Sequence, residues 1–157
     1  AGLTRKTVYN LFGTKEEIAL SLIARAEAAD AGYRARIALN EDAVALVENV
    51  LIDSARWCLA HPALARLALS PAERPSTAPP TDRPSFQGLV RDIVALGQKQ
   101  GRIRRDETPE FMALILLAVY GQAMLNALPQ GAVSEAEIGR IVRLVVEGIG
   151  GQGSMHS

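Results

Sequence analysis

The sequence predicts an all-α protein that folds as a helical bundle. Hydrophobic residues make up 48% of the 157 residues but aromatic residues only 4%, so a core has to be built from Leu, Ile, Val and Ala. Abundant Ala and Leu favour helix over sheet. Apolar residues recur every three or four positions along most of the chain. A chain of this length buries about 70% of its extended surface, so its core needs no disulfide or metal.

Charge and cysteine content narrow the possible functions. The 17 basic and 17 acidic residues cancel, so the total charge gives no sign of a nucleic-acid partner. Residues 1–15, however, contain Arg5, Lys6 and Lys15 and no acid. A local basic patch is compatible with DNA binding, because only the contacting face needs the charge. The single cysteine, Cys58, excludes an internal disulfide and fits a reducing compartment, so we expect a cytoplasmic protein.

Helix signals organise the first half of the chain. Thr14 and Glu17 form a capping box that predicts a helix over about 15–39. Asn40 is expected to cap the next helix, which ends near His61. Pro62 suits the first position of a short helix over 62–69. The second of these helices carries its inward residues at helical spacing: Val44, Val47, Leu51, Ser54, Ala55 and Cys58.

A proline-rich stretch divides the predicted helices. Residues 70–85 hold five of the eight prolines, which no helix or central strand tolerates. We expect an exposed loop there, either a variable connection or a lid near a pocket. Another helix is predicted from Ser85 to Gly101, and Thr108 followed by Pro109 predicts the start of the next.

The helix predicted over 111–128 is apolar on nearly all sides. Gln122 and Asn126 are its only clearly polar side chains. A membrane span is one interpretation, but the uninterrupted apolar run of 111–121 is shorter than the ~18–20 residues that a bilayer requires. We therefore expect this helix to be covered by the protein's own core on one side and by a partner chain on the other.

The last predicted helix is also broadly apolar. Ser134 and Glu137 form a second capping box, with Val133 and Ile138 as a hydrophobic staple. Two such helices packed on their copies would form a four-helix interface in a homodimer, although both can instead be core helices of a monomer. The residues predicted for this interface are Leu117, Tyr120, Met124, Leu128, Ile138, Ile141, Val142, Val145 and Ile149.

A short amphipathic helix is predicted at about 4–12. Thr4 is a good N-cap, and Val8, Leu11 and Phe12 lie on one inward face. The remaining side chains are basic, amide or hydroxyl groups of the kind that contact base edges and phosphates in a major groove. The residues expected to contact DNA are Thr4, Arg5, Lys6, Thr7, Tyr9, Asn10 and Lys15.

The order of residues in "AGLTRKTVYNLFGTKEEI" resembles the end of the DNA-binding domain of TetR-family transcriptional regulators. That pattern has Ala-Gly, an apolar residue, Ser or Thr, then Thr, an apolar residue, Tyr, Phe and later Lys-Glu. Lys6 stands where the family often has Gly, and Leu11 where it often has His. The matching residues are Ala1, Gly2, Leu3, Thr4, Thr7, Val8, Tyr9, Phe12, Lys15 and Glu16.

The resemblance implies a homodimeric regulator, in most members a repressor, that a small-molecule ligand releases from its palindromic operator. Residues 1–16 would be the remnant of a helix-turn-helix domain that lacks its first helix and most of its second. Residues 17–150 would form the ligand-binding and dimerisation domain, and 151–157 a flexible tail. We expect the chain alone to bind an operator poorly.

The resemblance also places an apolar ligand cavity among the helices that follow the first long one. Trp57 can line the cavity or simply pack, and His61 can instead cap its helix. Tyr120, Gln122 and Asn126 can orient a ligand or bond across a dimer. The candidate ligand-binding residues are Trp57, Cys58, His61, Phe86, Tyr120 and Met124.

Enzymatic activity is not expected. The sequence shows no metal-ligand spacing, phosphate-binding glycine loop or nucleophile–base pattern, and Cys58 has no nearby cation to activate it. No cofactor or metal is therefore predicted. The rival interpretation is a dimeric helical module that binds a small molecule or protein without DNA.

Overall fold

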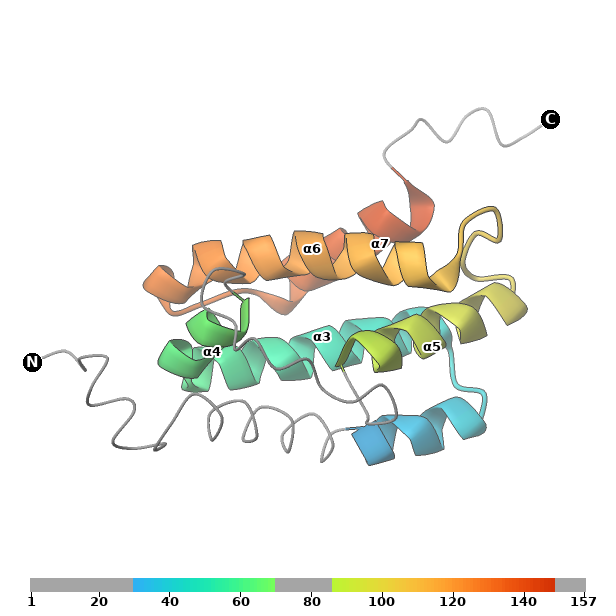
Figure 1. The fold of residues 1–157 in the computed structure, drawn as a ribbon, viewed down its shortest axis with the longest axis horizontal. Helices are drawn as coiled ribbons and strands as arrows, with labels where there is room; N and C mark the ends of the chain where they lie inside the picture. The colour runs from blue at the N-terminus through green and yellow to red at the C-terminus, as the bar shows by residue number, and fades with distance from the viewer. Residues whose placement is uncertain (1–29, 70–85, 149–157) are drawn as a thin grey trace, which may run out of the picture.

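A computed structural model describes residues 30–69 and 86–148, and every regular element among them is helical (Figure 1). The all-α prediction is thereby confirmed. Residues 30–38 are helical, and the helices after them follow in chain order: α3 (Ala43–Ala60), α4 (Pro62–Leu69), α5 (Phe86–Lys99), α6 (Pro109–Ala127), the 3₁₀ turn η1 (Leu128–Gln130) and α7 (Glu135–Glu147).

The helices lie in layers, with α3 and α5 side by side in the middle. Figure 1 shows α6 and α7 above this pair and the helix of residues 30–38 below it. α3 contacts α4, α5, α6 and α7, and α6 packs against both α5 and α7. The helix of 30–38 and the α6–α7 pair therefore occupy opposite sides of the α3–α5 layer.

The core lies between α3, α5, α6 and α7. The apolar stripe of each helix turns inward, which removes large aliphatic side chains from water and provides the main driving force for packing. The largest side chains with almost no exposure are Leu46, Val47, Leu51, Val90, Ile93, Leu116, Met124, Ile138 and Val142.

Two predicted helix starts are confirmed by their N-caps. The Thr108 hydroxyl accepts a hydrogen bond from the Phe111 N–H at 3.2 Å. The Ser134 hydroxyl accepts one from the Glu137 N–H at 3.1 Å. Each bond satisfies one of the N–H groups that a helix start leaves without an intrahelical partner. Pro62 is the first residue of α4, as predicted.

The predicted cap at Asn40 was wrong. Asp42 caps α3 instead, its carboxylate accepting a hydrogen bond from the Ala45 N–H at 3.0 Å. Asn40 ends the preceding helix and has a φ of 57°, a left-handed conformation that Asn tolerates better than most residues. Asn is favoured at both ends of helices, so the residue type did not show which end it occupies here. The sequence also did not reveal the turn at residues 39–40 that separates the two helices.

Several sequence predictions fall outside the described residues. They are the capping box of Thr14 and Glu17, the first half of the helix predicted over 15–39, the proline-rich stretch 70–85, Ile149 and the tail 151–157.

Gly97 of α5 lies close to two other chain segments, at Ile103 and at Ala43. A Cβ atom at this position would lie 2.5 and 2.7 Å from Cδ1 and Cγ1 of Ile103, and 3.1 Å from the Ala43 Cβ. Ile103 is itself buried and has little room to move. We therefore expect Gly97→Ala to lower the free energy of unfolding by about 1–3 kcal/mol, measured by urea denaturation.

Gly32→Ala is the matched control, because a Cβ there meets no atom within 4 Å. Alanine favours helix over glycine, so this variant should be neutral or more stable by up to about 1 kcal/mol. Equal losses in the two variants would contradict the close packing at Gly97.

Candidate functional site

The residues predicted to contact DNA lie outside the described part of the chain. These are Thr4, Arg5, Lys6, Thr7, Tyr9, Asn10 and Lys15. Three features of the described residues remain as candidates: an exposed apolar stripe on α6, a buried polar contact between α3 and α6, and a chain of ion pairs between residues 30–38 and α5.

The α6 stripe consists of Phe111, Leu114, Ile115 and Val119, whose exposed fractions lie between 40% and 54%. These positions recur at helical spacing on the side of α6 away from the core. α7, which packs against α6, adds Leu144 with an exposed fraction of 55%. Large apolar side chains gathered on one helix face are unusual for a surface that only meets water.

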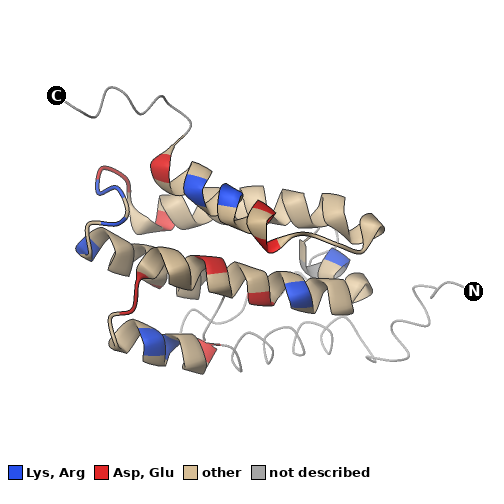
Figure 2. Cartoon of the chain, turned by 180° about the vertical axis from the view of Figure 1, so that it is seen from behind, with Lys and Arg blue, Asp and Glu red and all other residues tan. Residues whose placement is uncertain are grey.

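Charge is nearly absent from α6, although the rest of the described surface is rich in it. Figure 2 shows charged residues on α3, α7, residues 30–38 and the connection after α5, whereas α6 carries only Glu110 in its first turn. The face of the α6 stripe continues into exposed Gln122 and Asn126, whose side chains hydrogen-bond to each other at 3.1 Å. The surface is thus apolar along the first half of α6 and polar but uncharged near its end.

One described stretch, Pro109–Gln130, is long and apolar enough to cross a membrane on length and composition alone. Its best window has a mean hydropathy of 1.8, and 33% of that window is buried inside the fold. The core helix of a soluble protein passes the same test. Leu116, Tyr120 and Met124 of this helix are buried against the other helices.

The residues predicted for the dimer interface are mostly internal. Leu117, Ile141 and Val145 are partly buried, and Ile149 lies outside the described residues. The remaining five are buried within the chain itself and present no surface to a second copy: Tyr120, Met124, Leu128, Ile138 and Val142. The exposed apolar residues of α6 lie on the opposite face of the helix.

Tyr120, one of the predicted ligand-binding residues, places its hydroxyl beside Ser54 and Cys58 of α3. Tyr120 is 2% exposed and donates a hydrogen bond to the Ser54 hydroxyl at 2.9 Å. Burial raises the pKa of the Tyr120 hydroxyl well above its ordinary value, while the Ser54 hydrogen bond acts in the opposite direction. Cys58 and Met124 are also buried in this core. The tyrosine thus stays protonated and serves as a hydrogen-bond donor.

Trp57, His61 and Phe86 are less deeply placed. The rings of Trp57 and His61 stack with centroids 5.0 Å apart and planes 26° from parallel. His61 ends α3, and its Nδ1 lies 3.1 Å from the Trp57 carbonyl oxygen, so the predicted role as a helix cap is confirmed. Phe86 begins α5 and packs at the margin of the core.

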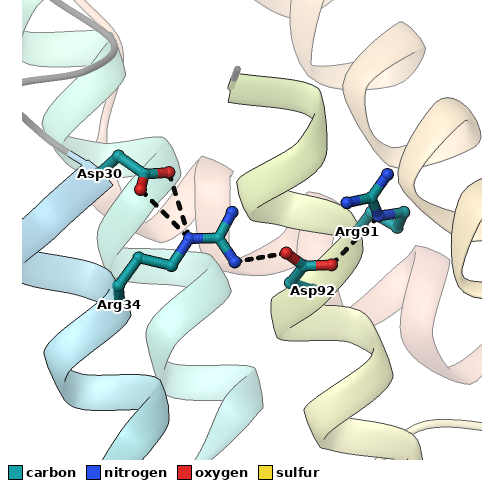
Figure 3. Close-up of polar contacts among 4 residues, drawn as sticks. All are labelled: Asp30, Arg34, Arg91 and Asp92. Atoms are coloured by element: carbon teal, nitrogen blue, oxygen red, sulfur yellow. Dashed lines mark hydrogen bonds and ion pairs between the residues drawn. The ribbon is translucent and has the colours of Figure 1, made fainter. Parts of the chain in front are cut away.

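A chain of alternating charges connects the helix of 30–38 to α5 (Figure 3). The Arg34 Nε lies 3.1 Å from Oδ2 of Asp30, one helical turn earlier, and Arg34 Nη1 also donates to Asp92. Arg91 donates to the other oxygen of Asp92 at 3.1 Å. Asp30 is the only buried charged residue among those described, with an exposed fraction of 8%.

The charges of this chain reinforce one another. Burial tends to raise the pKa of the Asp92 carboxyl, but hydrogen bonds from Arg34 and Arg91 outweigh it and hold the pKa below its ordinary value. For Arg34, burial tends to lower the pKa, and the bonds to Asp92 and Asp30 outweigh that effect. The Asp92 carboxylate and the Arg34 guanidinium are therefore both charged at neutral pH.

The ion-pair chain was not predicted from the sequence. Asp30 and Arg34 are four residues apart in a predicted helix, a spacing that favours an ion pair. Asp92 is 58 residues further along the chain, and no local pattern indicates that contact. Among the residues that the structure describes, no three His, Cys, Asp or Glu side chains are grouped so as to hold a metal ion.

Comparison with protein-family models, curated proteins and solved structures finds no significant match to this chain.

Proposed function

We propose that this chain is part of a DNA-binding transcriptional regulator of the TetR type, acting as a homodimer and most simply as a repressor. The observation that carries the proposal is the ordered match of residues 1–18 to the end of that family's DNA-binding domain. The basic and hydroxyl side chains of this stretch suit phosphates and base edges. The all-helical body behind it is compatible with the same layout.

The α6 stripe supports a second copy of the chain as the partner. An isologous dimer brings the same patch of both subunits together, so the patch has to be complementary to itself. An uncharged apolar stripe meets this condition, because like charges never face each other across the two-fold axis. Two α6–α7 pairs packed in this way form a four-helix bundle.

The effector in this proposal is a small, mainly apolar molecule that favours the state released from DNA. The core between α3, α5 and α6 consists mainly of aliphatic side chains, and the Tyr120 and Ser54 hydroxyls form a polar pair within it. Such an environment suits a ligand that offers one hydroxyl or carbonyl group and little charge.

Selection from random DNA duplexes, using the gene product that contains this chain, tests the proposal. We expect enrichment of a palindrome whose half-sites lie roughly 34 Å apart. Tyr9→Ala and Lys15→Ala should weaken binding to all sequences, whereas Arg5→Ala and Lys6→Ala should change the preferred bases. Arg104→Ala is the control, because that exposed side chain pairs locally with Asp106.

The absence of any enriched sequence would overturn the DNA-binding proposal. The alternative would then be a dimeric helical module that binds a small molecule or protein. The α6 stripe favours this alternative equally, because a surface for a second copy does not depend on DNA.

A further inference from the structure

The outer face of α6 changes character along its length. Phe111, Ile115, Gln122 and Asn126 fall within about 60° of one another around the helix, and all four are exposed. The α6 stripe occupies the first part of this face, and the two amides occupy the last part. A partner that covers the whole face therefore meets apolar side chains at one end and amides at the other.

The two amides depend on water as well as on each other. The Gln122 Nε2 donates to the Asn126 Oδ1 at 3.1 Å. This bond uses one of the amide N–H groups and one carbonyl oxygen, and the other polar atoms of both exposed side chains are open to water. Covering the amides with aliphatic side chains would remove that water and leave buried donors and acceptors without partners, which is costly.

Charge favours an antiparallel contact between the α6 helices of two copies. The α6 stripe carries no charge, so its own copy covers it without leaving a charged group unpaired. Glu110, in the first turn, is the one charged side chain of α6. Antiparallel helices keep the two Glu110 carboxylates at opposite ends of the contact and let the helix dipoles oppose each other, whereas parallel helices align both.

The ends of the stripe determine where the two-fold axis crosses α6. In such an antiparallel contact, a residue lies beside its own copy only where the axis passes. The midpoint of the stripe is Ile115, so an axis there places Phe111 of one copy against Val119 of the other and covers the whole stripe. Gln122 then lies level with Thr108, the exposed N-cap where the other α6 begins, and its amide stays in water.

Sliding the helices past each other is opposed in both directions. An axis about one turn nearer the C-terminus of α6 would place Gln122 of each copy against Ile115 of the other, away from water. An axis nearer the N-terminus would leave Val119 uncovered beyond the start of the other helix. The first slide is opposed by the amides, and the second by lost apolar burial.

We propose that the amide pair of Gln122 and Asn126 sets the register of an antiparallel α6–α6 contact whose two-fold axis crosses the helix at Ile115. The inference rests on the homodimer of the proposed function and assigns which side chains meet in it. The stripe supplies the affinity, and the amides exclude the longer overlap that a fully apolar face would allow.

Cysteine crosslinking of the full chain tests the register. A disulfide needs Cα atoms within about 7 Å, so Ile115→Cys should link to its own copy under mild oxidation. Val119→Cys should not, because its two copies lie about 12 Å apart along the helices. Phe111→Cys mixed with Val119→Cys should link to each other, although neither links to itself. The native Cys58 is buried and takes no part.

Replacing the amides should move the axis. In Gln122→Leu with Asn126→Leu the apolar face extends to residue 126, so its midpoint shifts to residues 118–119. Self-linking should then fall about tenfold at Ile115→Cys and appear at Val119→Cys. Gln87→Leu makes the same kind of change at an exposed position of α5 and should leave the linking pattern unaltered.

Sedimentation equilibrium separates the register from the dimer itself. A dimer that links neither at Ile115 nor in the mixed pair, or that still links at Ile115 after the amides are replaced, overturns the register and leaves the dimer standing. A monomer at micromolar concentration overturns both. A chain that links as expected, but whose gene product selects no DNA, keeps this register and loses only the regulatory function.

Discussion

Replacing Leu116 with alanine is expected to lower the free energy of unfolding by about 3–4 kcal/mol. Leu116 lies on the inward face of α6 with an exposed fraction of 1%. The substitution removes buried methyl groups and leaves a cavity that the neighbouring helices fill only in part. Urea denaturation followed by circular dichroism measures the loss, and an unchanged m-value shows that the denatured state is the same.

Leu114→Ala is the control for this prediction. It makes the same chemical change two residues earlier on the same helix, but Leu114 is 54% exposed. At protein concentrations where the chain is monomeric, its loss should be within about 0.5 kcal/mol. Similar losses for the two variants would mean that α6 does not present the faces described.

Replacing Leu114 and Val119 together by glutamate is expected to convert the proposed dimer into a monomer. Each copy would then place two carboxylates in the α6 stripe, and the two-fold axis would bring four of them together in a contact that excludes water. Burying unpaired charges of like sign is costly, so the dimer dissociation constant should rise by roughly a hundredfold or more. Sedimentation equilibrium at micromolar concentration measures the change.

Lys99→Glu is the control for the glutamate variant, because it adds a carboxylate to an exposed position on α5, outside the α6 stripe. This variant should remain as dimeric as the unmodified chain. Both proteins should keep their helical circular dichroism, because the substituted residues are exposed. A double variant that dimerises with unchanged affinity would remove the α6 stripe from the dimer interface.

Sequence patterns predicted the helices better than their orientation. The caps at Thr108 and Ser134 were recognisable because side chain and backbone partner are only three residues apart. The inward face of α6 was not recognisable, because its own side chains are apolar on all sides. When both faces of a helix are apolar, periodicity does not show which one faces the core. Tyr120 and Met124 were therefore assigned to the dimer interface, whereas the fold places them in the core.

The candidate sites show the same limit. The α6 stripe was foreseen as a surface for a partner, but its residues depend on which face the other helices cover. The ion-pair chain depends on Asp92 meeting Arg34 across 58 positions, and local spacing carries no information about such a contact. The residues expected to contact DNA were assigned from their order in the sequence and lie outside the described part of the chain.

The Gln100 side chain donates hydrogen bonds to Asn40 and Glu41, in the turn before α3, and this has a consequence for how the chain is made. The Ala43 N–H donates its hydrogen bond to the Oε1 of Gln100, 57 positions later. At a translation rate of about 5–20 residues per second, roughly 3–11 s pass between synthesis of the two partners. During this interval the helix of residues 30–38 has neither the Gln100 hydrogen bonds at its end nor its ion pair with Asp92. The emerging chain therefore cannot complete these contacts of the helix of residues 30–38 until residue 100 has been synthesised.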